Sequence, residues 1–167
     1  MRVVRTIAAA SAVLFLAGCG AAEPQATASP VATAKPACTK TAATPAGQRP
    51  PVLAGTTGSW YGSGDLWVGL PDRAAGTSGS TIELKSPWVT LDGSKPSKDM
   101  GLPEVSAARA GASDAVRATF TDYARAFGTG DLAFWPSTLA LPEAGCWTVT
   151  GRLKNTTVQF VVDVKAP

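Results

Sequence analysis

The chain has 167 residues, with 15 Lys and Arg against 12 Asp and Glu, and it contains no histidine. A net charge of +3 without a basic cluster argues against a nucleic-acid partner. The missing histidine excludes Ser-His-Asp and Cys-His catalysis and the commonest zinc and copper ligand, so we predict no catalytic residue, metal or bound cofactor.

The N-terminus has the features of a signal peptide that ends at a cysteine. Arg2 and Arg5 precede an apolar run, Ile7 to Leu16, which is too short to span a membrane as a mature helix. The sequence LAGC, ending at Cys19, resembles the lipobox of bacterial lipoproteins, whose cysteine sulfur takes a diacylglyceryl group before the chain is cut ahead of it. The resemblance implies removal of residues 1–18, a lipid on Cys19, and a membrane-anchored protein on the extracytoplasmic face.

Residues 19–51 are rich in Ala, Thr and Pro and contain few large apolar residues. Such a composition buries too little surface to offset the entropy of ordering, so we predict a flexible tether. As a coil, the part before Cys38 has a root-mean-square reach of about 23 Å. Without its two signal-peptide arginines the mature chain carries 13 basic and 12 acidic residues. Because this balance gives no basic surface for lipid headgroups, we expect the lipid on Cys19 alone to attach the protein to the membrane.

Residues 52–167 contain all five tryptophans and are enough for one hydrophobic core. Short apolar runs alternate with polar residues between glycine and proline turns, and this pattern predicts an antiparallel all-β sandwich. The clearest runs are Leu66 to Leu70, Ile82 to Lys85, Trp147 to Thr150 and Thr157 to Val164. Lys154 and Asn155 lie where a hairpin is expected to turn between the last two strands.

The segment from Ser113 to Gly128 fits two patterns. Val116, Phe120 and Phe127 recur at helical spacing, whereas Val116, Ala118 and Phe120 alternate as in a strand. Because the surrounding sequence is typical of β structure, we favour a strand to about Phe120 followed by a loop, with a helix as the alternative.

The three cysteines are expected to have different roles. With Cys19 lipidated, Cys38 and Cys146 remain as an even number in an oxidising compartment. We predict a disulfide between them, with two free thiols as the alternative. The bond closes a loop of roughly 100 residues, which in the chain-entropy model contributes about 4 to 5 kcal/mol to the free energy of unfolding.

Three stretches of the chain resemble a group of uncharacterised bacterial lipoproteins. The stretch TLALPEAGCWTVTGRLKNTTVQFVVDV, residues 138–164, is similar to the last two strands of exported immunoglobulin-like domains. ACTKTAATPAGQRPP and LWVGLP resemble the same group, which shares the paired cysteines. The resemblance implies a small immunoglobulin-like β-sandwich and no particular activity.

Two aromatic pairs are the candidate ligand contacts. Trp60 and Tyr61 adjoin the turn sequence GSGD, and Phe134 and Trp135 precede a proline. Flat rings at loop edges stack on sugars or peptides, although core packing is the alternative role for all four. We assign Trp67, Trp88 and Trp147 to packing.

The sequence favours a non-catalytic binding or structural module of the cell envelope. Its expected partner is an envelope protein or a cell-wall component. The alternative is a carbohydrate-active domain that uses two acidic residues, drawn from Asp65, Asp131 and Glu143, as a glycosidase-like pair.

Overall fold

The computed structural model describes residues 37–71, 76–109, 111–112, 114–126 and 132–165, and all of them belong to one compact unit. Residues 1–36, including the expected signal peptide and Cys19, lie outside the described residues. The signal peptide, the lipid on Cys19 and the tether before residue 37 therefore stay predictions.

The described residues are mainly strands, joined by short turns. The strands are β1 (Trp60–Ser63), β2 (Leu66–Gly69), β3 (Gly76–Ser78), β4 (Thr81–Asp92), β5 (Lys95–Pro96), β6 (Glu104–Arg109), β7 (Ala115–Arg117), β8 (Thr119–Phe120), β9 (Ala124–Arg125), β10 (Ala133–Leu141), β11 (Gly145–Leu153) and β12 (Thr156–Val164). One short helix, α1 (Pro51–Ala54), and two 3-10 turns, η1 (Ala46–Gln48) and η2 (Lys98–Met100), complete the elements of this part.

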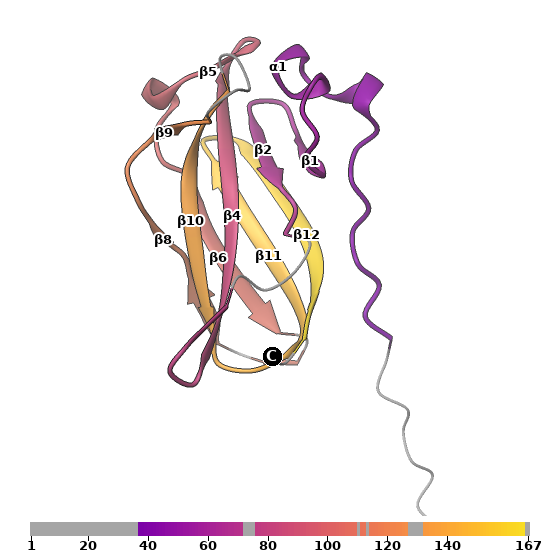
Figure 1. Ribbon diagram of the computed structural model, residues 1–167, viewed down its shortest axis with the longest axis vertical. Helices are drawn as coiled ribbons and strands as arrows, with labels where there is room; N and C mark the ends of the chain where they lie inside the picture. The colour runs from indigo at the N-terminus through magenta and orange to yellow at the C-terminus, as the bar shows by residue number, and fades with distance from the viewer. Residues whose placement is uncertain (1–36, 72–75, 110, 113, 127–131, 166–167) are drawn as a thin grey trace, which may run out of the picture. The chain divides into compact units, whose positions relative to one another are not determined.

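The strands form two antiparallel sheets (Figure 1). The larger sheet has the order β1-β2-β4-β10-β8, with β3 and β5 paired to β4 and β9 paired to β10. The smaller sheet has the order β12-β11-β6-β7, and its β11–β12 hairpin turns at Lys154 and Asn155. The predicted all-β sandwich and its C-terminal hairpin are therefore confirmed.

The main core lies between the two sheets. Trp88 of β4 is fully buried there, and its ring centroid lies 6.1 Å from that of Phe160 on β12. The Trp88 indole nitrogen donates to Ser137 Oγ, which in turn donates to the Ser86 carbonyl, so the buried polar atom is paired. A Cβ atom on Gly151 would lie 2.2 Å from the Trp88 ring, which explains a glycine inside β11.

A second, smaller core covers the outer face of the larger sheet. It consists of Leu53, Trp60, Trp67, Val89, Leu91 and Leu132, with α1 contributing Leu53. Strand β2 is buried on both faces, because Leu66 and Val68 belong to the main core and Trp67 to the second. The expected packing roles of Trp67, Trp88 and Trp147 are confirmed, since each is at most 5% exposed.

The ambiguous segment forms strands, and the helical alternative is wrong. Strand β7 pairs with β6 in the smaller sheet, and β8 pairs with β10 in the larger sheet. The chain therefore passes from one sheet to the other at Ala118. Val116, Ala118 and Phe120 pack against the main core, which is why the two-residue alternation prevails over the helical spacing. Beyond Phe120, where a loop was expected, Ala124–Arg125 adds the short strand β9.

Residues 37–49, which we call the strap, are packed on the sandwich and are not part of a flexible tether. The Thr41 amide donates to the Val161 carbonyl (3.1 Å), and the Val161 amide donates to Thr41 Oγ1 (2.9 Å). The Thr44 amide donates to the Trp60 carbonyl (2.8 Å), and Arg49 donates to the Thr44 carbonyl (2.7 Å). The strap thus joins β12 and β1, which are edge strands of different sheets (Figure 1).

Candidate binding site at the α1 end of the sandwich

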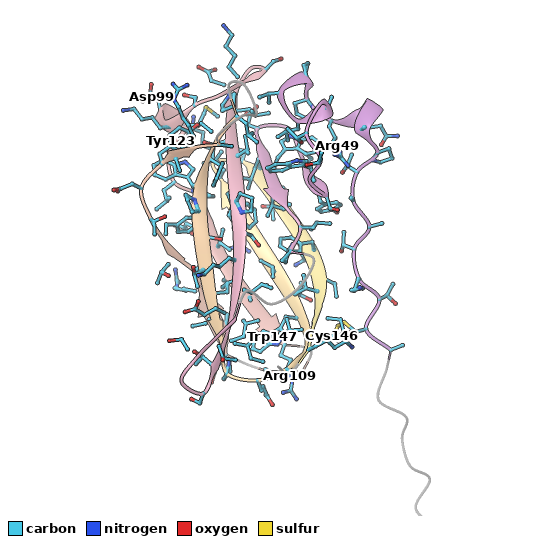
Figure 2. All side chains as sticks on the ribbon, in the orientation of Figure 1. Arg49, Asp99, Arg109, Tyr123, Cys146 and Trp147 are labelled. Carbon is cyan, nitrogen blue, oxygen red and sulfur yellow. A yellow bond between two sulfur atoms is a disulfide. The ribbon has the colours of Figure 1, made fainter. Side chains whose placement is uncertain are left out.

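The predicted disulfide is present, and it fixes one end of the strap. Cys38 and Cys146 are bonded, with their Cα atoms 5.4 Å apart. Figure 2 places Cys146 beside Trp147 and Arg109 at one end of the sandwich, which we call the disulfide end. From Cys38 the strap runs toward α1, which lies at the opposite end, the α1 end (Figure 1).

The α1 end contains a pocket of about 790 Å³, which we call the α1 pocket. Three separate segments build it: α1 with its following loop, the β4–β5 hairpin, and β9 with the start of β10. The residues that matter for its chemistry are Val52, Thr57, Ser94, Lys95, Tyr123 and Arg125. Its volume lies within the range of small-ligand sites.

Two cations line the α1 pocket. Lys95 of β5 and Arg125 of β9 are exposed, and neither forms an ion pair with another described residue. The described lining contains no Asp or Glu. The described lining therefore contributes two positive charges, and Asp99 is an acidic neighbour that acts on Tyr123 from outside it.

Tyr123 lines the same pocket, and its hydroxyl group is buried. Its oxygen and the indole nitrogen of Trp135 are both buried without a hydrogen-bond partner, and the two rings lie 4.9 Å apart at their centroids. Burial raises the pKa of Tyr123 above 10.0, Arg125 acts to lower it, and Asp99 acts to raise it. The phenol therefore stays protonated at neutral pH and can donate or accept a hydrogen bond.

The four aromatic candidates do not gather at one surface. Trp60 is 4% exposed in the second core, and its indole nitrogen donates to Thr56 Oγ1 (2.6 Å), so its burial favours the packing role given above as the alternative. Tyr61 and Trp135 are half-buried against the main core, and Phe134 is half-buried against the second. Of these, Trp135 reaches the α1 pocket only through its contact with Tyr123.

The acidic candidates are also separated. The Asp65 carbonyl accepts from the Leu91 amide at one end of β4, whereas Glu143 follows β10, whose Leu141 pairs with Ile82 at the other end. Leu91 and Ile82 are about 30 Å apart along β4. Because glycosidase carboxylates lie roughly 5 to 9.5 Å apart, Asp65 and Glu143 do not form such a pair.

Glu143 has a partner of its own, because it forms an ion pair with Arg109 at the disulfide end. Asp131, the third acidic candidate, lies outside the described residues. Within the part that the structure describes, no group of three or more His, Cys, Asp or Glu side chains is placed to hold a metal ion.

Comparison of the chain with protein families, with curated proteins and with solved structures finds no match. None of the helices in the described ranges has the length and apolar character needed to cross a membrane. The features from which a function can be inferred are therefore the disulfide, the strap and the α1 pocket.

Proposed function

We propose that this protein is a lipid-anchored, extracytoplasmic binding module of the cell envelope, with an immunoglobulin-like sandwich that acts without catalysis. The observation that carries the proposal is the Cys38–Cys146 disulfide. Stable disulfides are rare in the cytosol and common in exported proteins, so the bond supports export. The LAGC sequence at Cys19 supplies a signal and an anchor for the same destination.

The position of the strap supports a role in binding. The strap begins beside Cys38, at the disulfide end, whereas α1, which lines the α1 pocket, lies at the other end (Figures 1 and 2). Strand β4 runs between these ends and spans about 36 Å over Thr81–Asp92. A lipid on Cys19 would thus hold the sandwich at one end and leave the pocket accessible to an envelope protein or cell-wall component.

The alternative, a carbohydrate-active domain, has less support. Asp65 and Glu143 are at opposite ends of the sandwich, and Glu143 is ion-paired. No observation on the described residues favours that alternative, so we do not develop it as a second function.

The anchor is tested by expressing the full chain in a bacterial host that processes lipoproteins. We expect the protein in the membrane fraction and in the detergent phase of a phase-partition assay, with protease reaching it in spheroplasts. Cys19→Ala should move it out of the detergent phase, whereas the matched control Ala21→Ser, outside the LAGC sequence, should not. Wild-type protein in the aqueous phase, or protection from protease in spheroplasts, would contradict the proposal.

A further inference from the structure

We propose that the α1 pocket binds an acidic saccharide, meaning a sugar that carries a carboxylate or phosphate group. The proposal rests on the proposed function only in placing the protein at the cell envelope, where it would meet such a ligand. The type of ligand is inferred from the residues of the α1 pocket.

The first argument is charge. Lys95 and Arg125 come from different hairpins and line one pocket, and neither has an ion-pair partner among the described residues. A guanidinium group holds a carboxylate or phosphate through two parallel hydrogen bonds, and an ammonium group adds a point charge. The described lining holds no acidic residue, and Asp99, which acts on the pKa of Tyr123, forms no ion pair with either cation.

The second argument is the supply of hydroxyl groups. The Tyr123 hydroxyl is buried and unpartnered, and the side chains of Thr57 and Ser94 form no hydrogen bond with another described residue. Thr56 is different, because its hydroxyl is already paired with Leu53 and Trp60. Hydroxyl groups both donate and accept, so the two exposed ones, on Thr57 and Ser94, match the donors and acceptors of a sugar ring, whereas the Tyr123 hydroxyl is buried.

The third argument is shape. The prolines Pro51 and Pro96 and the ring of Tyr123 give the pocket rigid apolar surfaces between its polar groups. Flat apolar surfaces beside polar groups suit a saccharide, whose ring faces are apolar and whose edges are polar. A peptide is normally held by a free strand edge or by deep apolar holes for its side chains. In this pocket, β5 (Lys95–Pro96) is only two residues long and is already paired with β4, so it is a poor strand edge for a peptide.

Calorimetric titration tests the proposal with the mature protein, purified in detergent from membranes or from the soluble fraction if it is unanchored. Failure of the lipid anchor therefore leaves this experiment intact. The probes are a tetrasaccharide of alternating glucuronic acid and N-acetylglucosamine, glucose 6-phosphate, a neutral N-acetylglucosamine tetrasaccharide, inorganic phosphate and a tetraglutamate peptide. We expect at least one of the two acidic sugars to bind at least tenfold more tightly than the neutral sugar, phosphate and peptide. Which acidic sugar binds identifies the anionic group.

Variants test whether the α1 pocket is the site. Lys95→Gln with Arg125→Gln should weaken binding of the acidic sugar at least tenfold. The matched control, Lys98→Gln with Arg117→Gln, removes the same charge from exposed residues outside the pocket and should leave the affinity within twofold. Tyr123→Phe should leave both the affinity and the melting temperature nearly unchanged, because the hydroxyl is buried away from the pocket opening and has no hydrogen-bond partner among the described residues.

Several outcomes would overturn the proposal. Binding of neither acidic sugar, or equal binding of the neutral sugar, would remove the acidic saccharide as ligand. Equal binding of phosphate would reduce the pocket to a simple anion site, and equal binding of tetraglutamate would favour a peptide partner. An equal loss of affinity in the control pair would place the site elsewhere.

Discussion

Gly151 of β11 packs directly against the Trp88 ring across the main core. Of the two glycines in β11, Gly151 is the one at which an added side chain would clash. A Cβ atom at Gly151 would lie 2.2 and 2.4 Å from two Trp88 ring atoms, and the indole is itself held by Ser137. The ring cannot move aside without breaking that hydrogen bond. The sequence shows a glycine inside a strand, but only the structure shows the tryptophan that requires it.

We therefore expect Gly151→Ala to lower the free energy of unfolding by about 1 to 3 kcal/mol, the usual cost of overpacking a core. The control is Gly47→Ala in η1, where an added Cβ meets nothing within 4 Å, and it should change stability little. Denaturant unfolding of both variants gives the comparison. Equal stability of the two variants would contradict the packing described for Trp88.

At the scale of single elements, α1 does more than connect the strap to β1. It covers the second core with the fully buried Leu53, and its residues Pro51 and Val52 line the α1 pocket. The second core and the α1 pocket thus share the same helix of four residues. Because so short a helix is not stable alone, its position must come from the contacts of Leu53 and the strap.

Leu53→Ala is expected to lower the free energy of unfolding by about 2 to 4 kcal/mol through loss of burial and the cavity left behind. Leu102→Ala makes the same change at a residue that is 50% exposed and should cost much less. Both free energies are measured by denaturant unfolding, and the dependence of the free energy on denaturant concentration should be the same for the two variants. A loss at Leu53 as small as that expected at an exposed leucine would contradict the packing of α1 on the second core.

The contribution of the Cys38–Cys146 disulfide to stability can also be measured. Reduction, or Cys38→Ser with Cys146→Ser, should lower the melting temperature, since the chain-entropy model assigns the bond about 4 to 5 kcal/mol. Thr41→Val, which removes the strap's side-chain bond to Val161 but keeps the disulfide, should cost only about 1 kcal/mol. An unchanged melting temperature on reduction would mean that the bond does not stabilise the fold.

Local pattern accounts for some of these elements and misses others. The β11–β12 hairpin was predictable because Trp147 to Val164 alternates and turns at two suitable residues. The strap was not predictable, because its Ala, Thr and Pro residues have no periodicity and are held by distant partners at Val161 and Cys146. Hydrogen bonds to edge strands leave no signal in composition.

The candidate site was less accessible from sequence than the fold. Lys95, Tyr123 and Arg125 meet only because β5 and β9 flank the paired strands β4 and β10. Separately, each residue is an ordinary polar residue in a turn-rich stretch. Trp60 was expected at a loop edge because a turn follows it, but α1 lies over the larger sheet there and buries the ring.

At the scale of the whole molecule, three features combine: the lipid predicted on Cys19, the disulfide that fixes the strap, and the α1 pocket at the far end. The disulfide is present in the structure, and the lipid is a prediction from LAGC. A tether with a reach of about 23 Å would let the domain sample many orientations.

The most direct test of this account is the intact mass of the protein extracted from membranes without reductant. We predict a single species that begins at Cys19, carries a diacylglyceryl group with or without a further acyl chain, and lacks the hydrogens of two oxidised thiols. Reduction should restore those hydrogens and leave the lipid mass in place. A chain that keeps residues 1–18, a chain cut elsewhere without lipid, or a free thiol at Cys38 would contradict the account.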